Sequence, residues 1–136
     1  MGRIINVDSA GKNRNQLTKA IVLALNELPG MQHSIEKKRE LAAFISLSLS
    51  VIADTVDQSV SAWEKRGYWV KADRFRMEWY WTHQAAHELK ESLVASDWDR
   101  IDQLASQIAR KLVKVKVSPH HRMGQPWVGA WEMLKS

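Results

Sequence analysis

The chain contains no cysteine, only three prolines, and no apolar run long enough to cross a bilayer. The absence of cysteine excludes a disulfide framework, a thiolate nucleophile and a Cys-ligated zinc site. Pro29, Pro119 and Pro126 leave residues 31–118 free of proline, which suits long helices better than a β-fold with many turns. The most apolar stretch, residues 41–56, is shorter than the roughly 20 residues of a membrane-spanning helix, so we interpret it as buried core.

The size and overall composition of the chain are those of an ordinary globular protein. Its 136 residues are 45% hydrophobic and 26% charged, so we expect a single domain over residues 1–136. The first residues lack the apolar core of about 7 to 15 residues that marks a secretory signal peptide. We therefore expect a cytoplasmic protein that has no membrane association.

Apolar residues recur every three or four positions through most of the chain, and this spacing predicts an all-α fold. We expect helices at about 13–28, 34–66, 68–95 and 97–117, followed by a short aromatic tail at 118–136. Four helices with short connections predict an up-down-up-down four-helix bundle. One long helix over 34–95 is the alternative, but it would need a partner along its whole length, so we prefer a break at Gly67.

Local signals refine these boundaries. Ser34 is the expected N-cap of the second helix, and Ser96 that of the fourth, where Ser96 and Asp99 form a Ser-x-x-Asp capping pattern. Residues 45–51 alternate apolar and serine side chains with the period of a β-strand. We still predict a helix there, because helical spacing persists on both sides and no turn residues bound the segment.

Residues 63–81 hold four of the seven tryptophans among five basic residues. In the third expected helix, a seam from Tyr68 to Leu93 faces the core, yet apolar side chains also lie on other sides of the helix. Trp, Tyr and Met are enriched at protein contacts, so we predict a homo-oligomer, most simply a dimer. The alternative is that the tail folds back over this second face within one chain. The predicted interface residues are Trp69, Val70, Met77, Tyr80, Trp81, Trp127 and Trp131.

An RNA- or DNA-binding bundle is the alternative function, because the net charge is +5 and basic residues cluster near exposed aromatics. Acidic residues are interleaved with the first basic cluster, whereas the second contains none. No helix-turn-helix, RNP or zinc-finger pattern accompanies them. The candidate contacts are Lys65, Arg66, Lys71, Arg74, Arg76, Arg110, Lys111, Lys114, Lys116 and Arg122.

No catalytic or cofactor signature is recognisable, so we expect a protein that is not an enzyme and has no cofactor or metal. His83 and His87 are spaced i, i+4 and share a helix face, which is compatible with chelation. However, the repeated Glu-x-x-His pattern of di-iron bundles is missing, and we place both histidines on the flank of the third helix.

Overall fold

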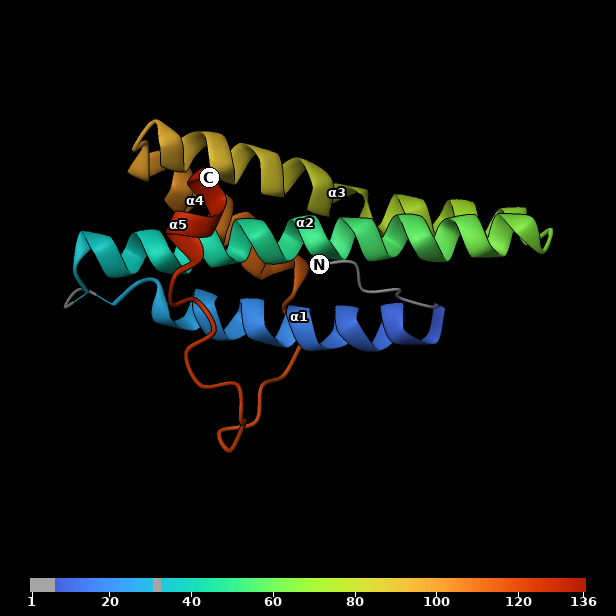
Figure 1. The fold of residues 1–136 in the computed structure, drawn as a ribbon, viewed down its shortest axis with the longest axis horizontal. Helices are drawn as coiled ribbons and strands as arrows, with labels where there is room; N and C mark the ends of the chain where they lie inside the picture. Colours follow the sequence, from blue (N-terminus) through green and yellow to red (C-terminus); the bar gives the residue numbers. More distant parts are fainter. Residues whose placement is uncertain (1–6, 31–32) are drawn as a thin grey trace.

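Five helices make up most of the structure, a computed structural model that describes residues 7–30 and 33–136. They are α1 (Val7–Glu27), α2 (Ile35–Lys65), α3 (Trp69–Val94), α4 (Trp98–Lys111) and α5 (Ala130–Lys135), and no strand occurs in the described ranges (Figure 1). The all-α prediction is confirmed. Among the residues described, no helix is both long enough and apolar enough to cross a membrane.

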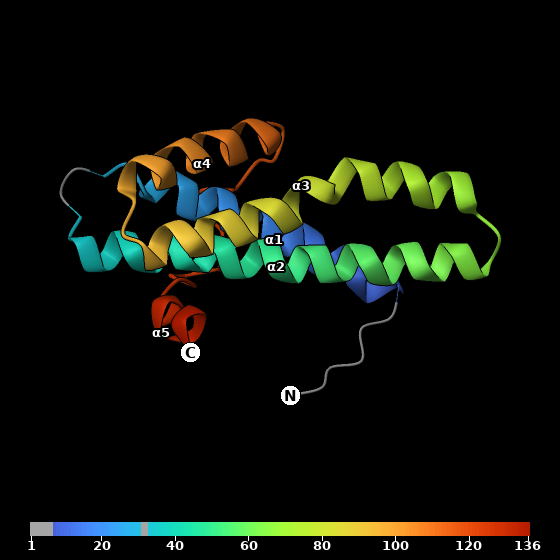
Figure 2. The same ribbon diagram turned by 90° about the horizontal axis from the view of Figure 1, so that it is seen from above.

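The long helix α2 is the centre of the packing. It contacts α1, α3 and α5, while α4 packs mainly on α3 and touches α1 over a small area. Figure 2 shows that α4 lies alongside only the C-terminal part of α3, whereas α2 and α3 continue together as a hairpin. The molecule therefore has a four-helix end and a hairpin end, and α1 lies alongside the first and only part of the second (Figures 1 and 2).

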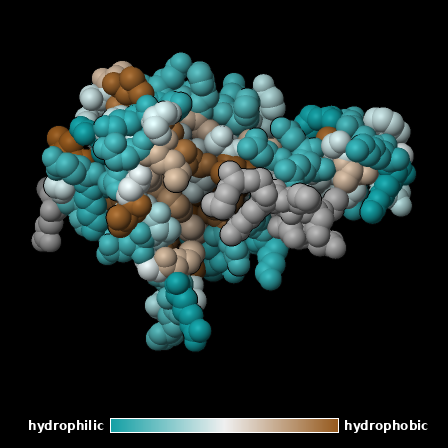
Figure 3. All heavy atoms as spheres, in the orientation of Figure 1, coloured by the Kyte–Doolittle hydropathy of each residue, from teal (hydrophilic) through white to brown (hydrophobic). Residues whose placement is uncertain are grey.

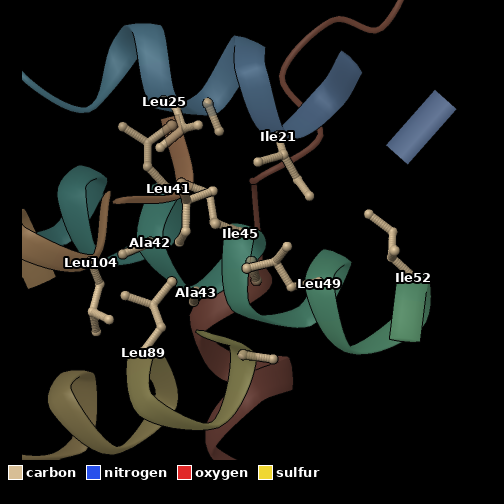
Figure 4. Packing of buried hydrophobic residues seen from close by; sticks show 14 of the residues in the cluster. Ile21, Leu25, Leu41, Ala42, Ala43, Ile45, Leu49, Ile52, Leu89 and Leu104 are labelled. Atoms are coloured by element: carbon tan, nitrogen blue, oxygen red, sulfur yellow. The ribbon is translucent and has the colours of Figure 1, made fainter. Parts of the chain in front are cut away.

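The core of the four-helix end is aliphatic and draws side chains from all four long helices (Figure 4). Ile21 comes from α1, Leu41 and Ile45 from α2, Leu89 from α3 and Leu104 from α4, and all five are almost fully buried. Burying an aliphatic side chain of this size stabilises the fold by about 1.5–3 kcal/mol. The spacing of apolar residues by threes and fours predicts four of these five residues on inward faces. Leu104 was missed.

The alternating segment of α2 is helical, as predicted, and its serines are buried along with its aliphatic residues. Ser46 is 2% exposed, and its hydroxyl donates a hydrogen bond of 2.8 Å to the Ala86 carbonyl oxygen on α3. A small residue allows the two helices to approach closely, and the bond satisfies the buried hydroxyl. The period-two pattern thus reflects small hydroxyl residues inside a helix interface rather than a strand.

The break between α2 and α3 falls at Gly67, which confirms the predicted hairpin. Gly67 has a φ of 82°; its N–H bonds the Glu64 carbonyl at 3.0 Å, and the Tyr68 N–H bonds that of Trp63 at 2.9 Å. This is a Schellman ending, which favours glycine at the left-handed position. Tyr68 is the N-cap of α3 and is 55% exposed, so the prediction that the core seam begins there was wrong. The seam begins at Ala72.

Two predictions about α4 also need correction. Its N-cap is Asp97, whose carboxylate accepts a 3.2 Å hydrogen bond from the Arg100 N–H, while Ser96 adopts a φ of 54°. The helix ends at Lys111 instead of about residue 117. Valine alternates with lysine over 113–117, and β-branched residues lose side-chain freedom in a helix. Pro119 further disfavours helix at Ser118.

The first helix begins at Val7, about six residues before its predicted start. Apolar spacing detects only the part of a helix that faces a core, and residues 8–16 are mostly polar. No proline interrupts them, and a single glycine, Gly11, costs only about 1 kcal/mol within a helix. The predicted start was therefore the start of the buried stripe, not of the helix. Ser34 does cap α2, accepting a hydrogen bond of 3.2 Å from the Lys37 N–H.

Candidate interaction surfaces

The N-terminal half of α3 is apolar on two opposite sides. Ala72, Phe75 and Trp79 face inward. On the other side, Trp69, Val70, Met77 and Tyr80 are exposed by 60%, 67%, 79% and 60%. At 100° per residue these four side chains fall within an arc of about 100°. We call this set the outer α3 face.

The inward side of the same stretch is already complete, because aromatic rings and one arginine fill it. Phe75 meets Trp63 of α2 edge-on, with ring centroids 4.9 Å apart and an interplanar angle of 81°. Arg14 of α1 lies over Phe75 at 4.7 Å and over Trp79 at 5.8 Å. Such contacts stabilise by about 0.5–2 kcal/mol each. The exposed residues of the outer α3 face are therefore not needed to fill the core.

Arg14 is the unexpected member of this cluster. Its guanidinium donates a hydrogen bond of 3.3 Å to the Thr55 hydroxyl, which itself donates to the Ile52 carbonyl at 2.7 Å. Burial lowers the pKa of Arg14, and the negative charge of Glu78 offsets part of this lowering. Sequence reasoning missed this residue, because an arginine at the polar start of a helix gives no signal that aromatic rings will receive it.

The outer α3 face is open because α4 is short. The 14 residues of α4 span about 21 Å, whereas the 26 residues of α3 span about 39 Å. Trp81 lies where α4 ends, half-buried, and lines a small cavity of about 110 Å³ together with Leu104, Ile108 and Lys111. Trp81 was predicted to be an interface residue. In the structure it packs against α4, apart from the other four predicted interface residues of α3.

Charges of both signs border the outer α3 face. Arg76 bonds Asp73 at 2.6 Å and Glu64 of α2 at 2.9 Å, and these hydrogen bonds raise the pKa of the guanidinium. Lys71 lies over the Trp63 ring at 4.5 Å. All five of the first group of candidate nucleic-acid contacts are exposed here, but acids stand among them: Lys65, Arg66, Lys71, Arg74 and Arg76.

The two predicted interface tryptophans of the tail are used within the chain. Trp127 is 5% exposed, and Trp131 is half-buried with Arg39 of α2 over its ring at 5.1 Å. The Glu40 carboxylate accepts hydrogen bonds from the backbone N–H groups of Gly129 and Trp131, the latter at 2.8 Å. The tail is therefore fastened to α2. The alternative in which it covers the outer side of α3 was wrong, since that side stays exposed.

The second group of candidate nucleic-acid contacts lies at the far end of α4 and in the connection to α5. This connection, residues 112–129, projects from the body of the protein beyond α1 (Figure 1). In Figure 3 the outer end of this projection is hydrophilic. All five basic residues of this group are exposed: Arg110, Lys111, Lys114, Lys116 and Arg122.

The two histidines of α3 are both exposed, on the flank of the helix. His87 lies 3.1 Å from the Glu91 carboxylate one turn further along. His83 borders a groove of about 690 Å³ between α2, α3 and α5. Over the residues that the structure describes, no three His, Asp or Glu side chains come together as a metal site would require.

A second groove, of about 570 Å³, separates α1 from α4. Leu25 of α1, Leu28 just after it and Ile35 of α2 form one wall, and Trp98 and Ala105 of α4 form part of the other. The groove exists because α1 and α4 contact each other over only a small area.

Comparison of the chain with protein-family models, curated proteins and solved structures finds no significant match.

Proposed function

We propose that this protein is a non-catalytic, up-down-up-down helical bundle that associates with itself, most simply as a dimer, through the outer α3 face. The observation that carries the proposal is the set of four large exposed side chains on one side of α3, opposite a core that is already filled. Scattered single apolar residues on a surface are ordinary, whereas a group that includes Trp, Tyr and Met is typical of a protein contact. The lack of cysteine fits our expectation of a cytoplasmic protein.

The spacing on α3 supports a helix as the matching surface. Val70, Asp73, Met77 and Tyr80 follow one another by three, four and three residues, which is the repeat of a helix-to-helix seam. Trp69 flanks this seam. A second helix laid along it would take the position that a longer α4 would occupy.

The charges of the face favour a second copy of the chain as the partner. In an antiparallel pair centred near residue 75, Val70 of one copy lies opposite Tyr80 of the other, and Asp73 lies near Arg76 of the other copy. Asp73 and Arg76, which are paired within each chain, would therefore also meet the opposite charge of the other copy across a two-fold axis, as an isologous interface requires. A partner of one charge would meet like charge on part of this mixed surface.

Light scattering coupled to size-exclusion chromatography tests the association. We expect about twice the 15.6 kDa chain mass for the unchanged protein, and a monomer for Met77→Glu, because the new carboxylate would be buried without a partner. Met133→Glu is the matched control, since Met133 of α5 is 69% exposed and borders the groove between α2, α3 and α5, outside the outer α3 face. A monomeric unchanged protein, or equal dissociation by both variants, would refute the proposed interface.

The absence of cysteine also allows the orientation to be tested by disulfide trapping. In the antiparallel pair, the two copies of residue 70 are about 15 Å apart along the axis, whereas residues 70 and 80 face each other. A mixture of Val70→Cys and Tyr80→Cys proteins should therefore cross-link under oxidation, and neither should do so alone. Cross-linking of each variant with itself would instead indicate a parallel pair.

A further inference from the structure

The net charge of the protein comes entirely from one segment. The chain has 20 Lys and Arg and 15 Asp and Glu. Residues 103–131 hold five of the former, Arg110, Lys111, Lys114, Lys116 and Arg122, and none of the latter. The remainder is balanced at 15 of each sign, so the net charge of +5 equals the charge of this stretch, which we call the acid-free segment.

The structure places three of these cations, Lys114, Lys116 and Arg122, on a projection that is held at both ends, and the other two in the last turn of α4. Leu112 and Trp127 are each 5% exposed and fix the two ends of the connection to the core. Between them the chain turns at residues 118–121, where the His121 N–H bonds the Ser118 carbonyl at 3.2 Å. The His120 N–H bonds the Ser118 hydroxyl at 3.1 Å. The tip of the projection, which Figure 1 shows as a loop, is thus a hydrogen-bonded turn.

The cations of the acid-free segment differ from those of the hairpin end in their neighbours. Arg76 at the hairpin end is neutralised by Asp73 and Glu64. None of the five cations of the acid-free segment forms an ion pair within the described part of the chain. A polyanion bound to this segment would therefore meet no acidic side chain of the segment. A polyanion bound at the hairpin end would meet the acidic side chains that pair with Arg76.

We propose that the acid-free segment binds the phosphate backbone of nucleic acid, without reading its sequence. Lys and Arg that neutralise phosphates release condensed counterions, and this supplies most of non-specific affinity. The projection also offers exposed donors at its turn, from Ser118 and His120. It is independent of the outer α3 face, so a monomeric protein retains it.

A nucleic acid fits this segment better than an anionic membrane does. Residues 118–122 at the tip are Ser, Pro, His, His and Arg, with no aromatic or large aliphatic side chain to enter a lipid interface. Met123, which follows, is half-buried, and the exposed valines of the connection, Val113 and Val128, lie at its two ends and not at the tip. Membrane-surface segments pair their basic residues with such apolar anchors on an amphipathic helix, and the connection is not helical.

Fluorescence anisotropy with a short labelled DNA duplex and a single-stranded RNA, between about 50 and 200 mM salt, tests the proposal. If all five cations meet duplex phosphates, a plot of log affinity against log salt concentration falls with a slope of about −4.5. Lys114→Gln with Lys116→Gln should reduce that slope by about 2 and weaken binding several-fold at the lower salt concentration. Lys65→Gln with Lys71→Gln removes the same charge at the hairpin end and should change the slope little.

The result that overturns the proposal is equal weakening by the two double variants, or no binding to either nucleic acid at the lower salt concentration. Retention on phosphatidylserine vesicles without binding to nucleic acid would overturn it as well, in favour of a membrane surface. Met77→Glu separates the two proposals: its monomer should keep the salt slope per chain if the acid-free segment binds by itself. Failure to self-associate therefore would not contradict nucleic-acid binding, and failure to bind nucleic acid would not contradict the dimer.

Discussion

The four-helix end and the hairpin end of the molecule are stabilised by different kinds of side chain. At the four-helix end, aliphatic residues such as Ile45 and Leu89 are packed from several helices, and Trp127 of the tail joins their cluster. At the hairpin end, α4 is absent, and Phe75 and Trp79 pack under the guanidinium of Arg14, while Trp63 meets Phe75 edge-on. With fewer helices to enclose the core, larger rings fill the space, and an amphipathic arginine covers them.

The difference also explains where the open surfaces lie. The four-helix end has helices on several sides of α3, so the apolar side chains of the C-terminal half of α3 are mostly used within the chain. The hairpin end leaves the outer side of α3 bare, and its exposed apolar residues are the ones that a second chain can cover. The proposed contact thus follows from the mismatch in length between α3 and α4.

The largest expected effect that bears on this comparison is at the four-helix end. Ile45→Ala should lower the free energy of unfolding by about 2–5 kcal/mol, because Ile45 is 1% exposed and its removal leaves a cavity among four helices. Urea denaturation followed by circular dichroism measures it. Val51→Ala on the same helix is the control, since Val51 is 41% exposed and should change stability by less than about 0.5 kcal/mol.

The sequence predicted the helical fold well because helical periodicity records which positions face a core. The four long helices, the hairpin at Gly67 and the cap at Ser34 all follow from spacing and turn chemistry. The end of α4 did not, because Ile101, Ile108, Leu112 and Val115 keep helical spacing past Lys111. The apolar period continues in the connection, where Val115 stays half-buried without a helix. Periodicity alone cannot separate a helix from an extended segment that packs on the same core.

The candidate surfaces were predictable only in part, for a similar reason. Helical projection found the second apolar side of α3, but it could not place Trp127 and Trp131 on α2. Their position depends on Glu40, which binds two backbone N–H groups 89 and 91 residues away in sequence. A long-range bond between a side chain and a backbone leaves no spacing signal. Arg14 was missed because its long-range contacts with two aromatic rings and the Thr55 hydroxyl leave no spacing signal either.

The next effect in size concerns the arginine at the hairpin end. Arg14→Ala should lower the free energy of unfolding by about 1–3 kcal/mol, because it removes two ring contacts and the bond to Thr55. Arg14→Lys keeps the charge but not the planar group that lies over both rings. It should therefore lower the free energy of unfolding by less than Arg14→Ala does, but still measurably. If Arg14→Ala were neutral in urea denaturation, the arginine would be a bystander and the rings alone would hold the hairpin end.

The smallest effects come from two turns that have the same geometry but different residues. Gly67 at the hairpin end and Ser96 at the four-helix end both have positive φ, at 82° and 54°, after a helix that ends with paired backbone hydrogen bonds. Ser96 bears the steric cost of the left-handed region that glycine avoids. Ser96→Gly should therefore stabilise the protein slightly, by up to about 1 kcal/mol. Gly67→Ala should destabilise it by about 1 kcal/mol through backbone strain alone, because no atom lies within 4 Å of the added Cβ. Thermal unfolding of the two variants measures both changes, and shifts of the same sign would show that the turns are not equivalent.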